Sequence, residues 1–239
     1  MSFWDYLFPS RCLNCQTRAD GNRGLCPACL RSIPLKTALT CGDCRGRIPV
    51  PTDRAGRPRW PSRRRTCHQH HPYLLAAATD YRDHPAIRAA IHGLKFDLIR
   101  GVAEPLGELL AAFLRELRLP TAGFLLVPIP LSRVRERRRG FNQAELLGRA
   151  VAAELGLPLA IDLLVRIDSA PPQSTLPDRA ARKQNVQGCF RVARPELAAR
   201  RKILLIDDVT TSGATLAEAA SVLRRAGALR VAAAVVAQA

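Results

Sequence analysis

Two adjacent acidic residues, Asp207 and Asp208, directly follow a short apolar run at residues 203–206. Four consecutive apolar residues favour a buried parallel strand, so both carboxylates are expected at the end of that strand. The residues that follow are rich in hydroxyl groups and lead directly into a helical pattern. This arrangement suits a sugar phosphate, because a helix N-terminus binds phosphate and carboxylates accept hydrogen bonds from vicinal hydroxyls. The expected phosphate-binding residues are Thr210, Thr211, Ser212, Gly213, Ala214 and Thr215.

Seven of the eight cysteines lie before residue 68, and six of them form pairs separated by two residues. The pairs are Cys12 with Cys15, Cys26 with Cys29 and Cys41 with Cys44, and a fourth half-site is Cys67 with His70. This spacing lets both side chains of a tight turn reach one tetrahedral Zn²⁺ ion. Clustered thiols in the reducing cytoplasm bind metal more often than they form disulfides. A redox-active dithiol is the alternative.

Four half-sites supply eight ligands, which is enough for two closed zinc sites. In a sequential pairing, the first ion is bound by Cys12, Cys15, Cys26 and Cys29, and the second by Cys41, Cys44, Cys67 and His70. A cross-braced pairing is the alternative, and His68 or His71 can replace His70 as the last ligand. Closed sites leave no position open for water, so we assign them a structural role for one or two ions rather than catalysis.

Basic residues gather in several segments that can meet a polyanion. Residues 133–139 contain five arginines next to a helix start, and we expect Arg133, Arg137 and Arg139 to neutralise pyrophosphate. Lys95 ends a helical pattern, while Arg182 and Lys183 lie in a polar stretch suited to a lid that excludes water. Residues 45–65 hold eight arginines and one acid, which indicates an extended basic loop that is either simply solvated or contacts phosphates.

The elements that position these groups alternate along the second part of the chain. Apolar runs predict strands at 74–79, 124–127, 159–165, 203–206 and 231–236. Between them, apolar residues three and four positions apart predict helices, one of which begins after Pro85 and another after Asn142. Alternating strands and helices imply a parallel sheet whose ligands lie at the C-terminal ends of the strands.

The length and charge of the chain limit the choice of function. With 239 residues, it can bury one α/β core and still carry a small module, and we predict a boundary between residues 1–72 and 73–239. A net charge of +17 favours polyanionic partners but does not by itself establish DNA binding. We expect a cytoplasmic protein, because no secretory signal is visible and the longest apolar runs are too short for a transmembrane segment.

The acidic pair and the turn after it resemble the motif that binds phosphoribosyl pyrophosphate (PRPP) in type I phosphoribosyltransferases. Asp207 and Asp208 match its two acids, and Thr211, Gly213 and Thr215 match its phosphate loop. Ser212 stands where threonine is usual, but the hydroxyl is kept. In a doubly wound protein of another kind, paired acids at this position often hold Mg²⁺ instead. The resemblance implies a type I phosphoribosyltransferase sheet flanked by helices.

Over nearly the full length, the chain resembles the ComF family, which combines a double zinc ribbon with a phosphoribosyltransferase domain. The further markers are the paired cysteine turns, residues 94–96, residues 139–143 and the segment around Arg182 and Lys183. The fourth half-site departs from the usual two cysteines because His70 replaces one of them. The resemblance implies a role in DNA uptake and competence.

Two functions follow from these features. As an enzyme, the protein would bind Mg²⁺ and PRPP, stabilise the developing ribose cation with the catalytic residues Asp207 and Asp208, and transfer the phosphoribosyl group to an unidentified acceptor. As a non-catalytic module, it would bind single-stranded DNA through its arginines or act as an adaptor that docks a protein of the DNA-uptake machinery.

Overall fold

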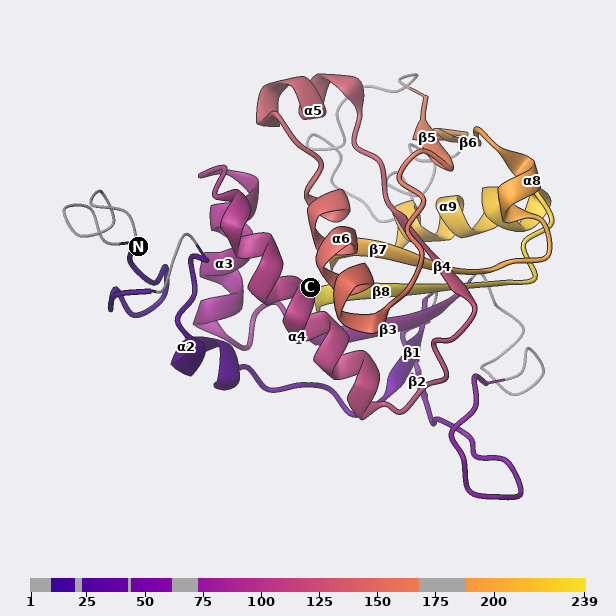
Figure 1. Ribbon diagram of the computed structural model, residues 1–239, viewed down its shortest axis with the longest axis horizontal. Coiled ribbons are helices and arrows are strands. Elements are labelled where there is room, and N and C mark those ends of the chain that lie inside the picture. Colours follow the sequence, from indigo (N-terminus) through magenta and orange to yellow (C-terminus); the bar gives the residue numbers. More distant parts are fainter. Residues whose placement is uncertain (1–9, 20–22, 43, 62–72, 168–187) are drawn as a thin grey trace.

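A computed structural model describes residues 10–19, 23–42, 44–61, 73–167 and 188–239. Its main feature is a six-stranded sheet, drawn in Figure 1 with helices on either side. In spatial order, the strands are β2 (Arg47–Ile48), β1 (Leu39–Cys41), β3 (Leu74–Asp80), β8 (Arg230–Gln238), β7 (Lys202–Thr210) and β4 (Phe124–Pro128).

Four of the strands, β3, β8, β7 and β4, run parallel to one another. Leu204 of β7 is level with Ala232 of β8 and with Leu126 of β4. The predicted α/β fold with a parallel sheet is therefore confirmed. β1 and β2 come from the cysteine-rich part of the chain and add an antiparallel hairpin beside β3. The boundary after residue 72 stays a prediction. Strands from both sides of it, β1 and β3, pair in the same sheet.

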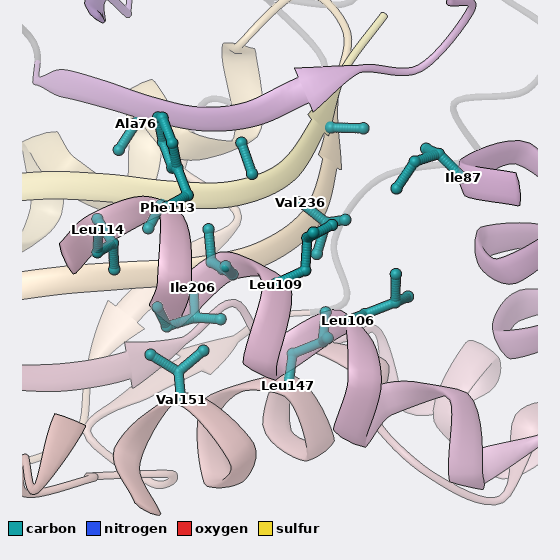
Figure 2. Close-up of a cluster of buried hydrophobic side chains, with 14 of the residues drawn as sticks. Ala76, Ile87, Leu106, Leu109, Phe113, Leu114, Leu147, Val151, Ile206 and Val236 are labelled. Carbon is teal, nitrogen blue, oxygen red and sulfur yellow. The ribbon is translucent and has the colours of Figure 1, made fainter. Parts of the chain in front are cut away.

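Alternating side chains of the strands build two hydrophobic layers, one on each face of the sheet. Leu204 and Ile206 point to one face, where three helices cover them; these are α3 (Pro85–Lys95), α4 (Ala103–Glu116) and α6 (Gln143–Leu155). Figure 2 shows this layer, with Phe113 and Leu147 facing Ile206 and Val236. Ile203 and Leu205 point to the other face, against α9 (Ala214–Arg225).

The predicted strand at residues 159–165 is largely wrong. Leu159 makes one isolated parallel bridge with Leu126, and the chain then leaves the sheet. The exposed Asp162 interrupts the apolar run and pairs with Arg194. Beyond it, β5 (Leu164–Arg166) joins β6 (Phe190–Val192) in a separate two-stranded antiparallel sheet. A short helix, α8 (Pro195–Ala198), follows β6.

The first two cysteine pairs lie on the α3 and α4 side of the molecule, where α2 (Pro27–Arg31) begins directly after Cys26 and contains Cys29. A Cβ atom placed on Gly24 would lie 2.4 Å from the Val102 side chain in the short helix η2 (Arg100–Val102), so the Gly24 backbone packs directly against that side chain. Arg23 also forms an ion pair of 2.5 Å with Glu108 of α4. Among the residues that the structure describes, no helix has both the length and the apolar composition needed to cross a bilayer.

Candidate functional site

The acidic pair lies near the end of β7, as the sequence predicts. Asp208 is only 2% exposed, whereas Asp207 is partly buried. The backbone N–H of Asp208 donates to Asp207 Oδ1 at 2.9 Å, and the N–H of Val209 donates to Asp208 Oδ1 at 2.7 Å. Each carboxylate is thus bound by the peptide that follows it. These bonds orient both side chains before any ligand arrives.

Lys95, which is distant from this pair in the sequence, brings a positive charge to it in the fold. It is the last residue of α3, and its Nζ atom lies 2.8 Å from Asp208 Oδ2. The lysine side chain is 23% exposed, so the ion pair is largely screened from water. The sequence placed Lys95 among the groups that meet pyrophosphate. In the structure its partner is a carboxylate, an ion pair that no sequence pattern indicated.

Replacing Lys95 with methionine should destabilise the protein, because the buried Asp208 carboxylate loses its cation. Breaking a fully buried pair costs about 3–5 kcal/mol, and the partial exposure of Lys95 reduces the expected loss in unfolding free energy to about 2 kcal/mol. Urea denaturation measures this change. The double replacement Lys95→Met with Asp208→Asn removes both charges and should recover most of the loss. Equal stability of Lys95→Met and the wild type would contradict the structural role of the pair.

The electrostatic setting of Asp207 differs from that of an exposed aspartate. Burial raises its pKa well above the ordinary value, and the adjacent Asp208 carboxylate raises it further, while the Lys95 ammonium opposes both effects. The carboxylate pair therefore holds a proton more readily than two exposed aspartates would. A ligand that brings positive charge or hydroxyl donors to Asp207 would favour the ionised form.

This pKa shift makes stability depend on pH. In the unfolded chain the pKa of Asp207 is about 3.9, whereas the pKa of the folded side chain is raised. Between these two values the folded protein binds more protons than the unfolded chain, so its unfolding free energy falls as pH rises. Asp207→Asn should remove this slope and be more stable than the wild type at neutral pH. Urea unfolding at a series of pH values from acid to neutral measures this pH dependence of the unfolding free energy. The control is Asp83→Asn, which replaces an exposed aspartate. Parallel pH profiles of the wild type and Asp207→Asn would refute the prediction.

The hydroxyl-rich turn connects β7 to α9. Gly213 has a φ of +79°, a left-handed conformation that favours glycine, and it caps the N-terminus of α9. Ser212 Oγ accepts a hydrogen bond of 3.4 Å from the N–H of Ala214, whereas Thr211 is exposed. The turn and the first residues of α9 therefore offer hydroxyl groups and N–H donors at a helix N-terminus, as an anion site requires. We call residues 211–215 the phosphate loop.

The arginine-rich segment forms a helix, α5 (Arg133–Arg139), which the sequence did not predict. Ser132 caps its start and Gly140 ends it in a left-handed conformation. Arg133 and Arg137 are exposed, while Arg139 is partly buried and donates to Gln143 Oε1 at 2.5 Å. Burial lowers the pKa of Arg139, and the negative charges of Asp208 and Asp207 counteract that shift. Arg139 thus interacts electrostatically with the acidic pair.

Asn142 and Arg100 hold the junction between α5 and α6 in place. Asn142 Oδ1 accepts from the N–H of Ala144, and its Nδ2 donates to the carbonyl of Ile129 just after β4. The predicted cap at Asn142 is therefore confirmed. Arg100 donates to the carbonyl of Gly140 at 2.8 Å and lies over the ring of Phe141. No motif marked Arg100 in the sequence.

Four cysteines come together in the N-terminal part of the chain. The sulfur atoms of Cys12, Cys15, Cys26 and Cys29 all lie within 4.8 Å of one another. Cys15 and Cys26 Sγ are 3.7 Å apart, close to the separation of about 3.8 Å that two bonds of 2.3 Å to a tetrahedral Zn²⁺ would give. The residues present therefore fit a structural zinc ion, and they are the set that sequential pairing predicts.

Hydrogen bonds to sulfur support this assignment. The Thr17 hydroxyl lies 3.0 Å from Cys15 Sγ and lowers the pKa of that thiol to about 6. The N–H of Cys29 interacts with Cys26 Sγ and lowers the pKa of Cys26. Such contacts favour the thiolate forms of Cys15 and Cys26, whereas burial and the neighbouring sulfur atoms raise the pKa of Cys29 to about 12.

The second predicted zinc site is only partly described. Cys41 ends β1 in a buried position, and the exposed Cys44 accepts a hydrogen bond from the N–H of Gly46. Cys67 and His70 lie outside the described residues, as do Arg182 and Lys183 of the predicted lid. The ligands of the second ion and the lid stay predictions.

Comparisons with known proteins agree with both parts of the chain. Residues 3–69 match the model of a double zinc ribbon domain, and residues 142–239 match that of a phosphoribosyl transferase domain. DNA utilization protein YhgH of Salmonella typhi is 32% identical over 229 residues, which cover 93% of this chain and 94% of the relative. The chain belongs to the ComF family. Membership confirms the predicted combination of a zinc ribbon with a phosphoribosyltransferase fold.

Other members of the ComF family show the same relationship. Competence protein F of Haemophilus influenzae is 28% identical over 230 residues, covering 92% of this chain and 93% of the relative. Competence protein ComFC of Bacillus subtilis is 35% identical over 108 residues, 45% of this chain and 41% of the relative. The match to the first two ComF relatives extends across both the cysteine-rich segment and the parallel sheet.

Proposed function

We propose that this ComF-family protein binds PRPP together with Mg²⁺ and transfers the phosphoribosyl group to an acceptor. One observation carries the proposal. The acidic pair at the end of β7 leads, through a left-handed glycine, into a hydroxyl-rich helix N-terminus. A phosphoribosyl transferase match that spans this same segment supports it.

Each part of PRPP has a suitable partner in this arrangement. The 5′-phosphate would bind the phosphate loop, with Thr211, Ser212 and Thr215 as hydroxyl donors. The ribose hydroxyls would donate to the carboxylates of Asp207 and Asp208. Pyrophosphate would face the α5 arginines, and Arg139 is favoured there because its charge already interacts with the acidic pair. The segment of Arg182 and Lys183 would complete the site as a lid.

The reaction breaks the bond between ribose C1 and a pyrophosphate oxygen, and pyrophosphate leaves with the electron pair. Positive charge then develops on the ribose ring until a nucleophile forms the new bond at C1. Asp207 and Asp208 oppose that charge with oriented carboxylates in a largely buried setting, where electrostatic stabilisation is strong. Arg139 counters the negative charge of the leaving group.

The residues present also fit a magnesium ion that arrives with the substrate. Mg²⁺ prefers carboxylate oxygens, phosphate oxygens and water over nitrogen or sulfur ligands. The Asp207 carboxylate is partly exposed and offers such oxygens, whereas Asp208 is engaged by Lys95. When bound, the ion would supply charge neutralisation for pyrophosphate.

Thermal unfolding with PRPP tests the proposal directly. At a PRPP concentration 100 times the dissociation constant, binding should add about 2.7 kcal/mol to the unfolding free energy and raise the melting temperature. The shift should depend on Mg²⁺, and AMP, which lacks pyrophosphate, should give a smaller one. Absence of any shift at millimolar PRPP would contradict the proposal.

Single-stranded DNA binding is a second candidate, favoured by the exposed arginines. Five of them follow the third cysteine pair, namely Arg45, Arg47, Arg54, Arg57 and Arg59, and α5 exposes four more. The names of the DNA utilization and competence relatives support a role in DNA handling. Affinity for oligo(dT) should fall with salt by about 0.7 logarithmic units for each phosphate neutralised, per tenfold increase in salt concentration. Affinity independent of salt would contradict electrostatic binding.

A further inference from the structure

The phosphate loop is in direct contact with the cysteine-rich part of the chain. A Cβ atom placed on Gly213 would lie 2.8 Å from the hydroxyl of Tyr73 and 2.9 Å from the carbonyl oxygen of Gly42. Gly42 lies between Cys41 and Cys44, in the turn of the third cysteine pair. The backbone of the phosphate loop is therefore packed against the turn between Cys41 and Cys44, and no side chain fits between them.

Tyr73 provides the polar contact at this junction. It is 4% exposed, and its hydroxyl donates to the carbonyl of Gly213 at 3.2 Å. The same carbonyl accepts from the N–H of Ala217 at 2.9 Å, in the first turn of α9. The tyrosine thus fixes the peptide at which the loop becomes a helix. Since that peptide sets the direction of the loop, Tyr73 influences where the loop can hold an anion.

Gly42 in turn holds the tyrosine. Its N–H donates to the carbonyl of Tyr73 at 3.1 Å, and a Cβ atom on Gly42 would lie 2.3 Å from the phenol ring. The ring therefore rests on the backbone of the cysteine turn. Arg45 makes a second connection, because it donates to the carbonyl of Ala239, whose N–H donates to Thr210 at the end of β7.

We propose that Tyr73, supported by Gly42, is a positioning residue that holds the phosphate loop in its anion-binding conformation. Through this contact, the cysteine-rich part of the chain influences the affinity for the 5′-phosphate end of the ligand. Tyr73 itself touches the loop rather than the ligand. This inference rests on the proposed function. It predicts an effect on ligands that carry the 5′-phosphate and none on pyrophosphate, which distinguishes positioning of the loop from a general loss of structure.

Tyr73→Phe tests the inference because it removes the hydroxyl and keeps the ring. Titration calorimetry on the full-length, zinc-loaded protein compares PRPP, ribose 5-phosphate and pyrophosphate, each with Mg²⁺. We expect the first two to bind about 5- to 10-fold more weakly, as for the loss of one hydrogen bond, with pyrophosphate unchanged. Gly42→Ala, which must displace the ring, should give the same selective loss. The matched control is Tyr81→Phe, whose ring packs in the hydrophobic layer of the α4 face.

Hydrogen exchange provides a readout that needs no ligand. In Tyr73→Phe, amides of the phosphate loop and the first turn of α9 should exchange faster, while those of α4 and α6 keep wild-type rates. Unchanged loop exchange, unchanged affinities or an equal loss for pyrophosphate would each overturn the positioning role. If the wild type binds neither PRPP nor ribose 5-phosphate, the proposed function fails, and the exchange rates alone decide whether Tyr73 holds the loop.

Discussion

Replacing both Asp207 and Asp208 with asparagine is expected to lower phosphoribosyl transfer by at least about 1,000-fold. Removing a single preoriented electrostatic group from an active site costs about 100- to 1,000-fold, and this change removes two. Asparagine keeps the size of each side chain and still accepts a hydrogen bond. The loss should therefore reflect missing negative charge beside the ribose ring rather than a changed shape of the site.

Pyrophosphate release and the Mg²⁺-dependent thermal shift with PRPP measure this prediction. Circular dichroism and zinc content should match the wild type, since neither carboxylate lies in the cysteine cluster. Glu104→Gln, an exposed substitution in the first turn of α4, is the matched control for loss of a surface carboxylate. Undiminished turnover in the double variant would exclude the proposed chemistry.

Loss of the four-cysteine cluster should have the largest effect on stability. Cys29→Ser removes one buried ligand, and structural zinc ions contribute about 10–16 kcal/mol of apparent binding free energy in isolated zinc-finger peptides. We expect the variant to lose one equivalent of zinc and to unfold the N-terminal turns. Because Arg23 and Gly24 join those turns to α4 and η2, the melting temperature of the whole protein should also fall.

Elemental analysis and thermal unfolding measure both outcomes. Cys189→Ala is the control, since that buried cysteine lies in the hydrophobic layer beside α9 and outside the cluster. Prolonged chelation of the wild type should reproduce the effect of Cys29→Ser. Full zinc content in Cys29→Ser would show that the four sulfur atoms do not form one metal site.

The local parts of the fold could be predicted from the sequence because their signals are local. Periodicity located α3, α4, α6 and α9, and the unbroken apolar runs located β7 and β8. The arginine-rich α5 was missed because six of its seven residues are charged, and its one apolar residue, Val134, is exposed and forms no apolar face. The strand predicted at 159–165 was largely wrong because the exposed Asp162 interrupts the apolar run and forms an ion pair with Arg194 outside the main sheet.

Some parts of the candidate site could likewise be predicted from the sequence, and others could not. The acidic pair and the phosphate loop are contiguous, so their order in the chain already indicates their chemistry. The partners that act across the fold are not contiguous. Lys95 reaches Asp208 from another helix, and Tyr73 reaches Gly213 from the start of another strand. No spacing rule connects residues that far apart, and only the folded sheet brings them together.

The antiparallel pairing of β1 with β3 has a consequence for how the protein can be divided. Thr40 and Cys41 cover the backbone of Leu75 and Leu74. A fragment starting at residue 73 would leave those N–H and C=O groups as an open edge strand, which invites pairing with a second copy and aggregation. The cysteine-rich segment therefore covers the edge of the parallel sheet and prevents its self-association, in addition to providing metal ligands. Loss of solubility in such a fragment would follow from the bare edge alone, even with every PRPP-site residue intact.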